Sequence, residues 1–257
     1  MLNLIRADLY RILRSKALWI TFSVLVVFVV ASGMTGVIGT IGMYNSALED
    51  LNTLKSGSML QLGQMAAGDD LFYFFLPILV VVVTTDFTNG TVKNTLGKGC
   101  SRVTYYCSKL ILSMVVCSVF VVMFNTFPLL VGTLLYGLGD YFETYNYFRI
   151  LATQIPLYLA VVSLGCFIAL TVKKTASLNA IYIPMFIVAQ IVITILVNLN
   201  SKFIALMDFE LSMGVRKYAL VETITNNDIL AKWGLGIIVI VITTVLGIIL
   251  FRRSEIK

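Results

Sequence analysis

Six long apolar stretches alternate with shorter polar segments along the chain. An α-helix rises ~1.5 Å per residue, so about twenty apolar residues cross a ~30 Å hydrocarbon core. The pattern predicts an all-α membrane protein, organised as a single transmembrane domain over residues 1–257. We expect the six spans at residues 17–40, 71–85, 105–138, 150–172, 177–199 and 230–251.

Two of these spans have unusual lengths. The second is short, and we expect it to begin before residue 71. The third, with no charge from Leu110 to Leu138, is long enough to tilt or to break near Asn125 and Pro128. All four prolines lie in the spans and are candidate hinges, since each removes a hydrogen bond from its helix. They are Pro77, Pro128, Pro156 and Pro184.

The polar stretch 86–109, DFTNGTVKNTLGKGCSRVTYYCSK, lies between two apolar segments and carries four cations and one anion. A short basic segment between two spans is normally cytoplasmic. We expect a short helix over residues 91–96, with Asp86, Thr88 or Asn89 as its cap. Two glycines then let the chain turn before a new helix starts at Ser101. This helix is either a docking element for a partner or a structural loop.

The cations are distributed unevenly between the two expected sides of the membrane. Of the nineteen lysines and arginines, thirteen lie in the four segments 1–16, 86–109, 173–174 and 252–257. Ten of the thirteen acidic residues lie on the other side. Cytoplasmic loops carry the excess of lysine and arginine, so we expect a multi-pass cell-membrane protein with both termini in the cytoplasm.

Residues 1–16, MLNLIRADLYRILRSK, have apolar side chains at helical spacing between cations. Such a helix can lie in the membrane interface with its cations near anionic head groups. The alternative is an ordinary positively charged flank of the first span. The cations concerned are Arg6, Arg11, Arg14 and Lys16.

The remaining connections are less regular. Residues 41–70 predict a polar, mostly acidic loop of weak helical character. Residues 139–149 are an aromatic and acidic turn of the kind found at membrane interfaces. Residues 200–230 predict a mixed loop that is too apolar around 203–211 to be fully in water.

Composition excludes several kinds of chemistry. With 59% hydrophobic and 12% charged residues and a mean hydropathy of +0.94, the chain is not a soluble domain. Its net charge of +6 comes from loop cations, which does not indicate a nucleic-acid partner. The absence of histidine removes the commonest metal ligand and general base. No cofactor is expected on this chain, and the four cysteines are interpreted as free thiols.

We find no motif for catalysis or nucleotide binding. The phosphate-loop pattern is missing, because LGKGC at 96–100 lacks the leading glycine. No charge lies in the middle of an expected span, which disfavours an ion-coupled transporter or an intramembrane enzyme.

One motif resembles a known family. The order of residues in 86–110 is similar to the coupling segment of type-two ABC exporter permeases. The matching residues are Asp86, Phe87, Gly90, Thr91, Val92, Lys93, Asn94, Leu96, Gly97, Gly99, Ser101, Arg102, Ser108, Lys109 and Leu110. The opening LIRADLYRILRSKALW, the ending FRRSEIK and six spans in 257 residues resemble the same family.

The resemblance implies a cytoplasmic coupling helix between spans two and three that docks on an ATPase. It implies two separate ATPase subunits that hold ATP and Mg²⁺, and a second permease chain, identical or related. The residues expected to dock are Asp86, Phe87, Thr88, Asn89, Gly90, Thr91, Val92, Lys93, Asn94, Thr95, Leu96 and Arg102.

The expected function is therefore export of an amphipathic or hydrophobic cargo, such as a peptide antibiotic, a toxin-like peptide or a drug. Export of sodium or of a lipid-linked cargo by the same fold is an alternative. A second alternative is a membrane anchor that recruits a cytoplasmic partner without moving a cargo.

Overall fold

The structure is a computed structural model that describes residues 2–35, 56–139, 144–221 and 223–254. Within these ranges all regular elements are helical. They are α1 (Leu2–Leu13), α2 (Lys16–Thr35), α4 (Gly57–Ala66), η1 (Gly68–Asp70), α5 (Leu71–Leu79), η2 (Val80–Thr84), α6 (Thr85–Thr88), α7 (Thr91–Gly97), α8 (Arg102–Tyr136), α9 (Thr144–Val172), α10 (Thr175–Leu199), η3 (Ser201–Phe203), α11 (Ile204–Met207), α12 (Leu211–Leu220) and α13 (Asn226–Arg253).

Six helical segments are long and apolar enough to cross a membrane, which confirms the predicted number of spans. They are Lys16–Thr35, Gly68–Thr88, Arg102–Tyr136, Tyr147–Val172, Thr175–Leu199 and Asn226–Arg253. The second span begins at Gly68, before residue 71, as expected from its short apolar core. The predicted residues 36–40 of the first span lie outside the described residues.

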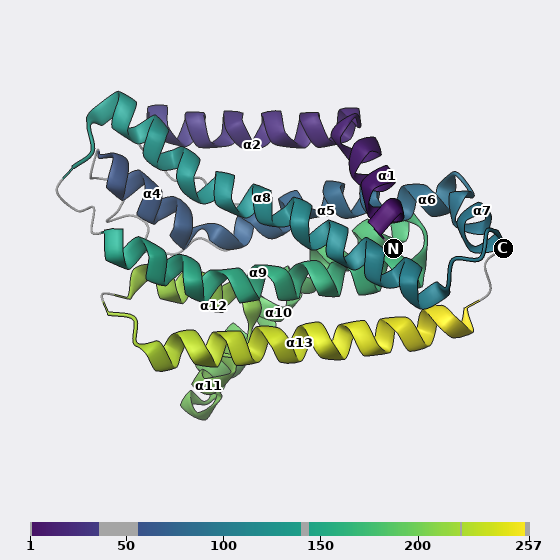
Figure 1. Cartoon of the computed structure of the whole chain (residues 1–257). Coiled ribbons are helices and arrows are strands. Elements are labelled where there is room, and N and C mark those ends of the chain that lie inside the picture. Colours follow the sequence, from purple (N-terminus) through teal and green to yellow (C-terminus); the bar gives the residue numbers. More distant parts are fainter. Residues whose placement is uncertain (1, 36–55, 140–143, 222, 255–257) are drawn as a thin grey trace.

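The long helices lie side by side in one bundle, and the described ends of the chain lie at the same end of it (Figure 1). We call this the terminal end; α6 and α7 also lie there, beside the start of α1 (Figure 1). The short helices α4 and α12 lie towards the other end, which we call the far end (Figure 1). The helix α9 packs along α13 and α8 and occupies the interior of the bundle.

The third span does not break near Asn125 and Pro128. The helix α8 is continuous from Arg102 to Tyr136. Pro128 is buried in it, so the missing hydrogen bond does not end the helix. The other three prolines also lie inside helices α5, α9 and α10, and their role as hinges stays a prediction.

The prediction of a polar loop over residues 41–70 is wrong for its described part. Residues Gly57–Ala66 form α4, nearly all of it buried, and η1 continues the chain into the second span. Glycines explain the close packing of α4 against α8. A Cβ atom on Gly132 would lie 2.7 Å from the Cα atom of Gly57, so neither position has room for a side chain. Residues 36–55 lie outside the described part.

Candidate functional site

The polar stretch after the second span folds into two short helices and a turn. α6 ends at Thr88, and Gly90 has a φ of 67°, which glycine adopts without strain, before α7 begins at Thr91. The predicted short helix is thus confirmed, but Gly90, rather than Asp86, Thr88 or Asn89, stands at its amino-terminal cap. Ser101 starts α8 as expected, since its hydroxyl accepts a hydrogen bond from the Thr104 amide.

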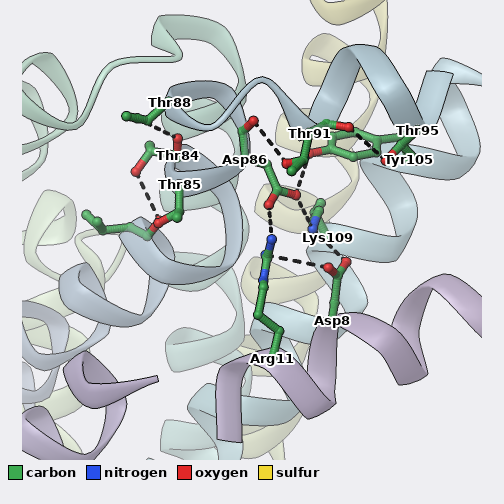
Figure 2. Close-up of polar contacts among 11 residues, drawn as sticks. Asp8, Arg11, Thr84, Thr85, Asp86, Thr88, Thr91, Thr95, Tyr105 and Lys109 are labelled. Atoms are coloured by element: carbon green, nitrogen blue, oxygen red, sulfur yellow. Dashed lines mark hydrogen bonds and ion pairs between the residues drawn. The ribbon is translucent and has the colours of Figure 1, made fainter. Parts of the chain in front are cut away.

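Instead of capping α7, the Asp86 carboxylate turns into the bundle and is 3% exposed. Figure 2 shows it between Arg11 of α1 and Lys109 of α8. The Lys109 Nζ atom lies 2.5 Å from Asp86 Oδ2 and 2.6 Å from Asp8 Oδ2. Arg11 bridges the same two acids, and the Tyr105 hydroxyl donates to Asp86 Oδ2 at 2.9 Å. We call Asp8, Arg11, Asp86, Tyr105 and Lys109 the terminal-end charge cluster.

The charges of this cluster balance. Two carboxylates face one ammonium and one guanidinium, and Lys109 is fully buried. Burial would lower the pKa of Arg11, but its hydrogen bond to Asp86 and the charges of Asp86 and Asp8 raise it above its ordinary value. Removing one member of a buried ion pair leaves an uncompensated charge, at a cost of about 3–5 kcal/mol. The cluster therefore fixes α1, α6 and α8 to one another.

The end of α13 joins the same assembly through aromatic rings and backbone carbonyls. The ring of Tyr105 stacks on Phe251 at a centroid distance of 5.8 Å, and Phe87 meets Phe251 edge-on at 6.3 Å. Arg102 donates to three carbonyl oxygens at the carboxyl end of α13, including that of Arg252 at 2.6 Å. Positive charge is favourable at that end of a helix. Arg102 thus caps α13 within the chain.

A turn of π-helix, η2, connects the membrane part of the second span to α6. The Thr84 and Thr85 hydroxyls both donate to the Val80 carbonyl, at 3.0 and 2.9 Å. The Thr91 hydroxyl donates to the Asp86 carbonyl, and Figure 2 shows this run of threonines beside the cluster. These bonds hold the α6–α7 segment against the end of its own span.

The residues expected to dock on a partner divide into an inner and an outer set. Asp86 and Val92 are buried, while Phe87 and Leu96 pack against the core of the bundle. The exposed set lies on α7 and the turn before it. It consists of Thr88, Asn89, Lys93 and Asn94. Gly90, Thr91 and Thr95 are half-buried.

The cations of the amino-terminal helix divide in the same way. Residues 2–13 form α1, so the helix itself is confirmed. Arg6, Arg14 and Lys16 are exposed, and Arg14 lies over the Tyr10 ring at 4.4 Å. Arg11 points inward to the charge cluster, so it is not available to lipid head groups as expected.

A second buried ion pair lies at the far end. Arg216 of α12 forms two parallel hydrogen bonds to Asp69 of η1, both 2.6 Å long. Gln190 of α10 donates to Asp69 at 3.4 Å and to Ser212 at 2.7 Å. The bidentate geometry suits arginine and carboxylate. Sequence reasoning missed this pair, because Asp69 and Arg216 are 147 positions apart and each was assigned to a loop.

The described spans carry no charge in their middle, as predicted, but they do bury charges nearer their ends. Asp69, Asp86, Lys109 and Lys232 are all buried inside helices of the six spans. They lie near the helix ends: Asp69 and Asp86 fall outside the predicted spans, and Lys109 and Lys232 lie among the first five residues of the predicted spans 105–138 and 230–251. Each has a partner: the Lys232 ammonium, for example, donates to the Asp208 carbonyl at 2.5 Å.

The fold and the site define the class of the protein: a multi-pass α-helical membrane protein with a polar segment fixed to one end of its bundle. Comparison with family models then identifies the family. The model described as "ABC-2 family transporter protein" matches residues 2–256, so the chain belongs to that family. It is a membrane permease component without an ATPase domain, of the kind that works with ABC ATPase subunits. No curated protein matched the chain in sequence.

Proposed function

We propose that this chain is the membrane-spanning subunit of an ATP-driven exporter that moves an amphipathic or hydrophobic cargo. In this proposal two ABC ATPase subunits bind ATP and Mg²⁺ beneath a pair of permease chains. The terminal end faces the cytoplasm, as the excess of cations in its segments indicates. The exposed face of α7 is the coupling surface for the ATPase.

One observation carries the proposal. The same short segment presents Lys93 and Asn94 outward and holds Asp86 inward in the terminal-end charge cluster. A force on α7 therefore reaches α1 through Arg11 and α8 through Lys109 without crossing a mobile linker. Coupling requires a partner contact that differs between two states of the membrane helices, and a rigid connection transmits that difference.

The exposed surface supports this class of cargo. Apolar side chains of α10 and α13 dominate the faces outside the bundle, which suits entry of an apolar cargo from the bilayer. Sodium export stays an alternative, although the buried acids Asp69 and Asp86 are both paired with cations. A lipid-linked cargo is an alternative, and it would also enter from the bilayer. Family membership favours a transport role over the non-transporting anchor.

Affinity purification from the native host tests the proposal. We expect an ABC ATPase subunit to co-purify with the chain and its ATP hydrolysis to respond to hydrophobic peptides. The variant Lys93→Glu reverses a charge on the coupling surface and should lose most of the bound ATPase. Lys202→Glu is the matched control, since Lys202 is an exposed lysine of η3, outside the α6–α7 segment. Equal ATPase recovery with both variants would contradict the coupling surface.

A further inference from the structure

A cavity opens into the bundle from its lipid-facing side, between α8 and α9. Its volume is ≈ 70 Å³, and its floor is formed by Phe75, Val121, Tyr158 and Val162. These four side chains are buried, whereas Val122 at the rim is 49% exposed. Val122 and Tyr158 lie near the middle of their helices, so the cavity opens at the centre of the bilayer. Whatever enters comes from the hydrocarbon phase.

The size and lining of the cavity select an apolar group. A cavity of ~150 Å³ lined by aliphatic and aromatic side chains binds benzene. About half of that volume fits a short aliphatic group, such as a branched side chain of an amino acid. The floor supplies the same apolar contacts that a protein core gives a leucine side chain.

A layer of buried amides lies on the far-end side of the cavity, one helical turn along α8 and α9 from residues that line it. Asn125 lies one helical turn beyond Val121, and its Nδ2 atom donates to the Val121 carbonyl at 2.8 Å. Helical side chains lean towards the amino terminus, so the Asn125 amide leans over the turn that forms the cavity floor. Its Oδ1 atom is buried and has no hydrogen-bond partner among the described residues.

Three glutamines extend this layer. Gln61 of α4 donates to the Asn125 main-chain carbonyl at 2.8 Å, which holds α4 beside it. Gln64 lies one turn further along α4 and is fully buried, yet neither of its amide atoms has a partner within the described chain. In α9, Gln154 precedes Tyr158 by one turn, and its Oε1 atom is likewise unpaired among these residues. Buried polar atoms in a membrane are normally satisfied by protein, water or ligand.

From this juxtaposition we propose that the α8–α9 cavity and the amide layer form a binding site for an amphipathic molecule. Its short hydrocarbon group occupies the cavity, and a hydrogen-bond donor next to that group, such as an amide N–H, reaches Asn125 Oδ1. A hydrophobic peptide and an amide-bearing lipid share this chemistry. The proposal deepens the proposed function, on which it rests for the role of the site in transport, by naming what a cargo must present.

The order of the cavity and the amide layer along α8 is consistent with export. α8 runs from the terminal end to the far end, and the amide layer lies beyond the cavity in that direction. In the proposed orientation, a molecule that enters from the bilayer centre finds its polar contacts on the outer side. Its polar group is thus drawn towards the outer half of the bundle.

Photolabelling tests the site on the full chain reconstituted in nanodiscs. The probe is N-octanoyl-photo-leucine amide, whose diazirine sits on the branched side chain that we assign to the cavity. We expect labelled peptides from the central part of α8 or α9. Val122→Phe should block the opening of the cavity and reduce that labelling about tenfold or more. A tenfold loss corresponds to roughly 1.4 kcal/mol of binding free energy.

The chain offers a matched control. Val119→Phe makes the same change about one turn earlier on α8, on a valine that is 53% exposed and does not line the cavity. It should leave labelling unchanged. Asn125→Leu should reduce labelling by roughly fivefold, which corresponds to about 1 kcal/mol. A probe methylated at both of its amide nitrogens, so that no N–H remains, should bind wild-type protein and Asn125→Leu equally weakly.

Mass spectrometry of lipids extracted from the purified protein distinguishes the two sources. If adding the probe in the dark releases an amide-bearing lipid from the protein, the natural occupant is a lipid. If the probe labels the site and no lipid is released, a peptide is favoured. Labelling that is equal in Val122→Phe and Val119→Phe would overturn the site. Labelling needs no ATPase, so this failure would leave the proposed exporter function standing, and loss of ATPase co-purification would leave the site standing.

Discussion

Replacement of Lys109 by methionine gives a sharp prediction about the terminal-end charge cluster. The ammonium of Lys109 is fully buried and contacts two carboxylates, Asp8 at 2.6 Å and Asp86 at 2.5 Å. Methionine keeps most of the side-chain volume but leaves both acids facing a single cation, Arg11. Loss of one partner from a buried charge pair costs about 3–5 kcal/mol, and we expect Lys109→Met to reduce the free energy of unfolding by that amount.

A second substitution separates charge from packing. Asp86→Asn in the Lys109→Met background leaves one acid, Asp8, facing one cation, Arg11. Neutral replacements of a buried ion pair are often tolerated, so the double variant should regain at least ~1.4 kcal/mol relative to Lys109→Met alone. Lys98→Met, at an exposed position in the turn after α7, should stay within about 0.5 kcal/mol of wild type.

Unfolding in mixed detergent micelles, followed by tryptophan fluorescence, measures these differences. Trp19 donates its indole N–H to the Leu13 carbonyl at 2.8 Å and so reports on the junction of α1 and α2. The experiment uses a Trp233→Phe background, because the chain has two tryptophans. If Lys109→Met is no less stable than Lys98→Met, or if Asp86→Asn makes it worse, the reasoning about the charge cluster is wrong.

Three further predictions concern other contacts. Tyr105→Phe keeps the stack on Phe251 but removes the hydrogen bond to Asp86, and should cost about 1.5 kcal/mol in the same assay, whereas no change would contradict that bond. Arg216→Met should lower the free energy of unfolding by about 3–5 kcal/mol, measured by thermal unfolding. Arg216→Lys should lower it somewhat less, because lysine keeps the charge but cannot make two parallel bonds to Asp69. Equal stability of all three proteins would refute the ion pair. Gly132→Leu should force α4 away from α8, lower the free energy of unfolding by about 1–3 kcal/mol and speed deuterium exchange over residues 57–66. Unchanged exchange would show that the contact between α4 and α8 has room for a side chain.

The number of spans was predictable because each apolar run is long and its hydropathy is unambiguous. The ends of the spans differ from the predicted ones by several residues, because charged residues near helix ends lowered the local hydropathy. Asp86 illustrates the limit. Its carboxylate is buried only because Arg11 and Lys109 come from distant parts of the sequence to neutralise it, and no local pattern indicates such partners.

The burial of α4 was not predictable for a similar reason. The sequence GSMLQLGQMA has the polarity of a loop, and its glycine contact depends on Gly132, which lies in another helix. The short helix α7 was predictable from the candidate caps before it and the glycines that flank it, and not from helix propensity, since threonine and valine are poor helix formers. Which side of α7 faces the bundle was not predictable, because it depends on the direction in which α6 continues from the π-helical turn.

Site-specific photo-crosslinking in living cells tests the central claim most directly. A photoreactive amino acid replaces Lys93 on the exposed face of α7, and in a control it replaces Leu134, which is 86% exposed near the far end. The account predicts a cross-link from position 93 to an ABC ATPase subunit, and none from position 134. Absence of an ATPase cross-link from position 93 and from its neighbour 94 would contradict the claim that this face couples the permease to ATP hydrolysis.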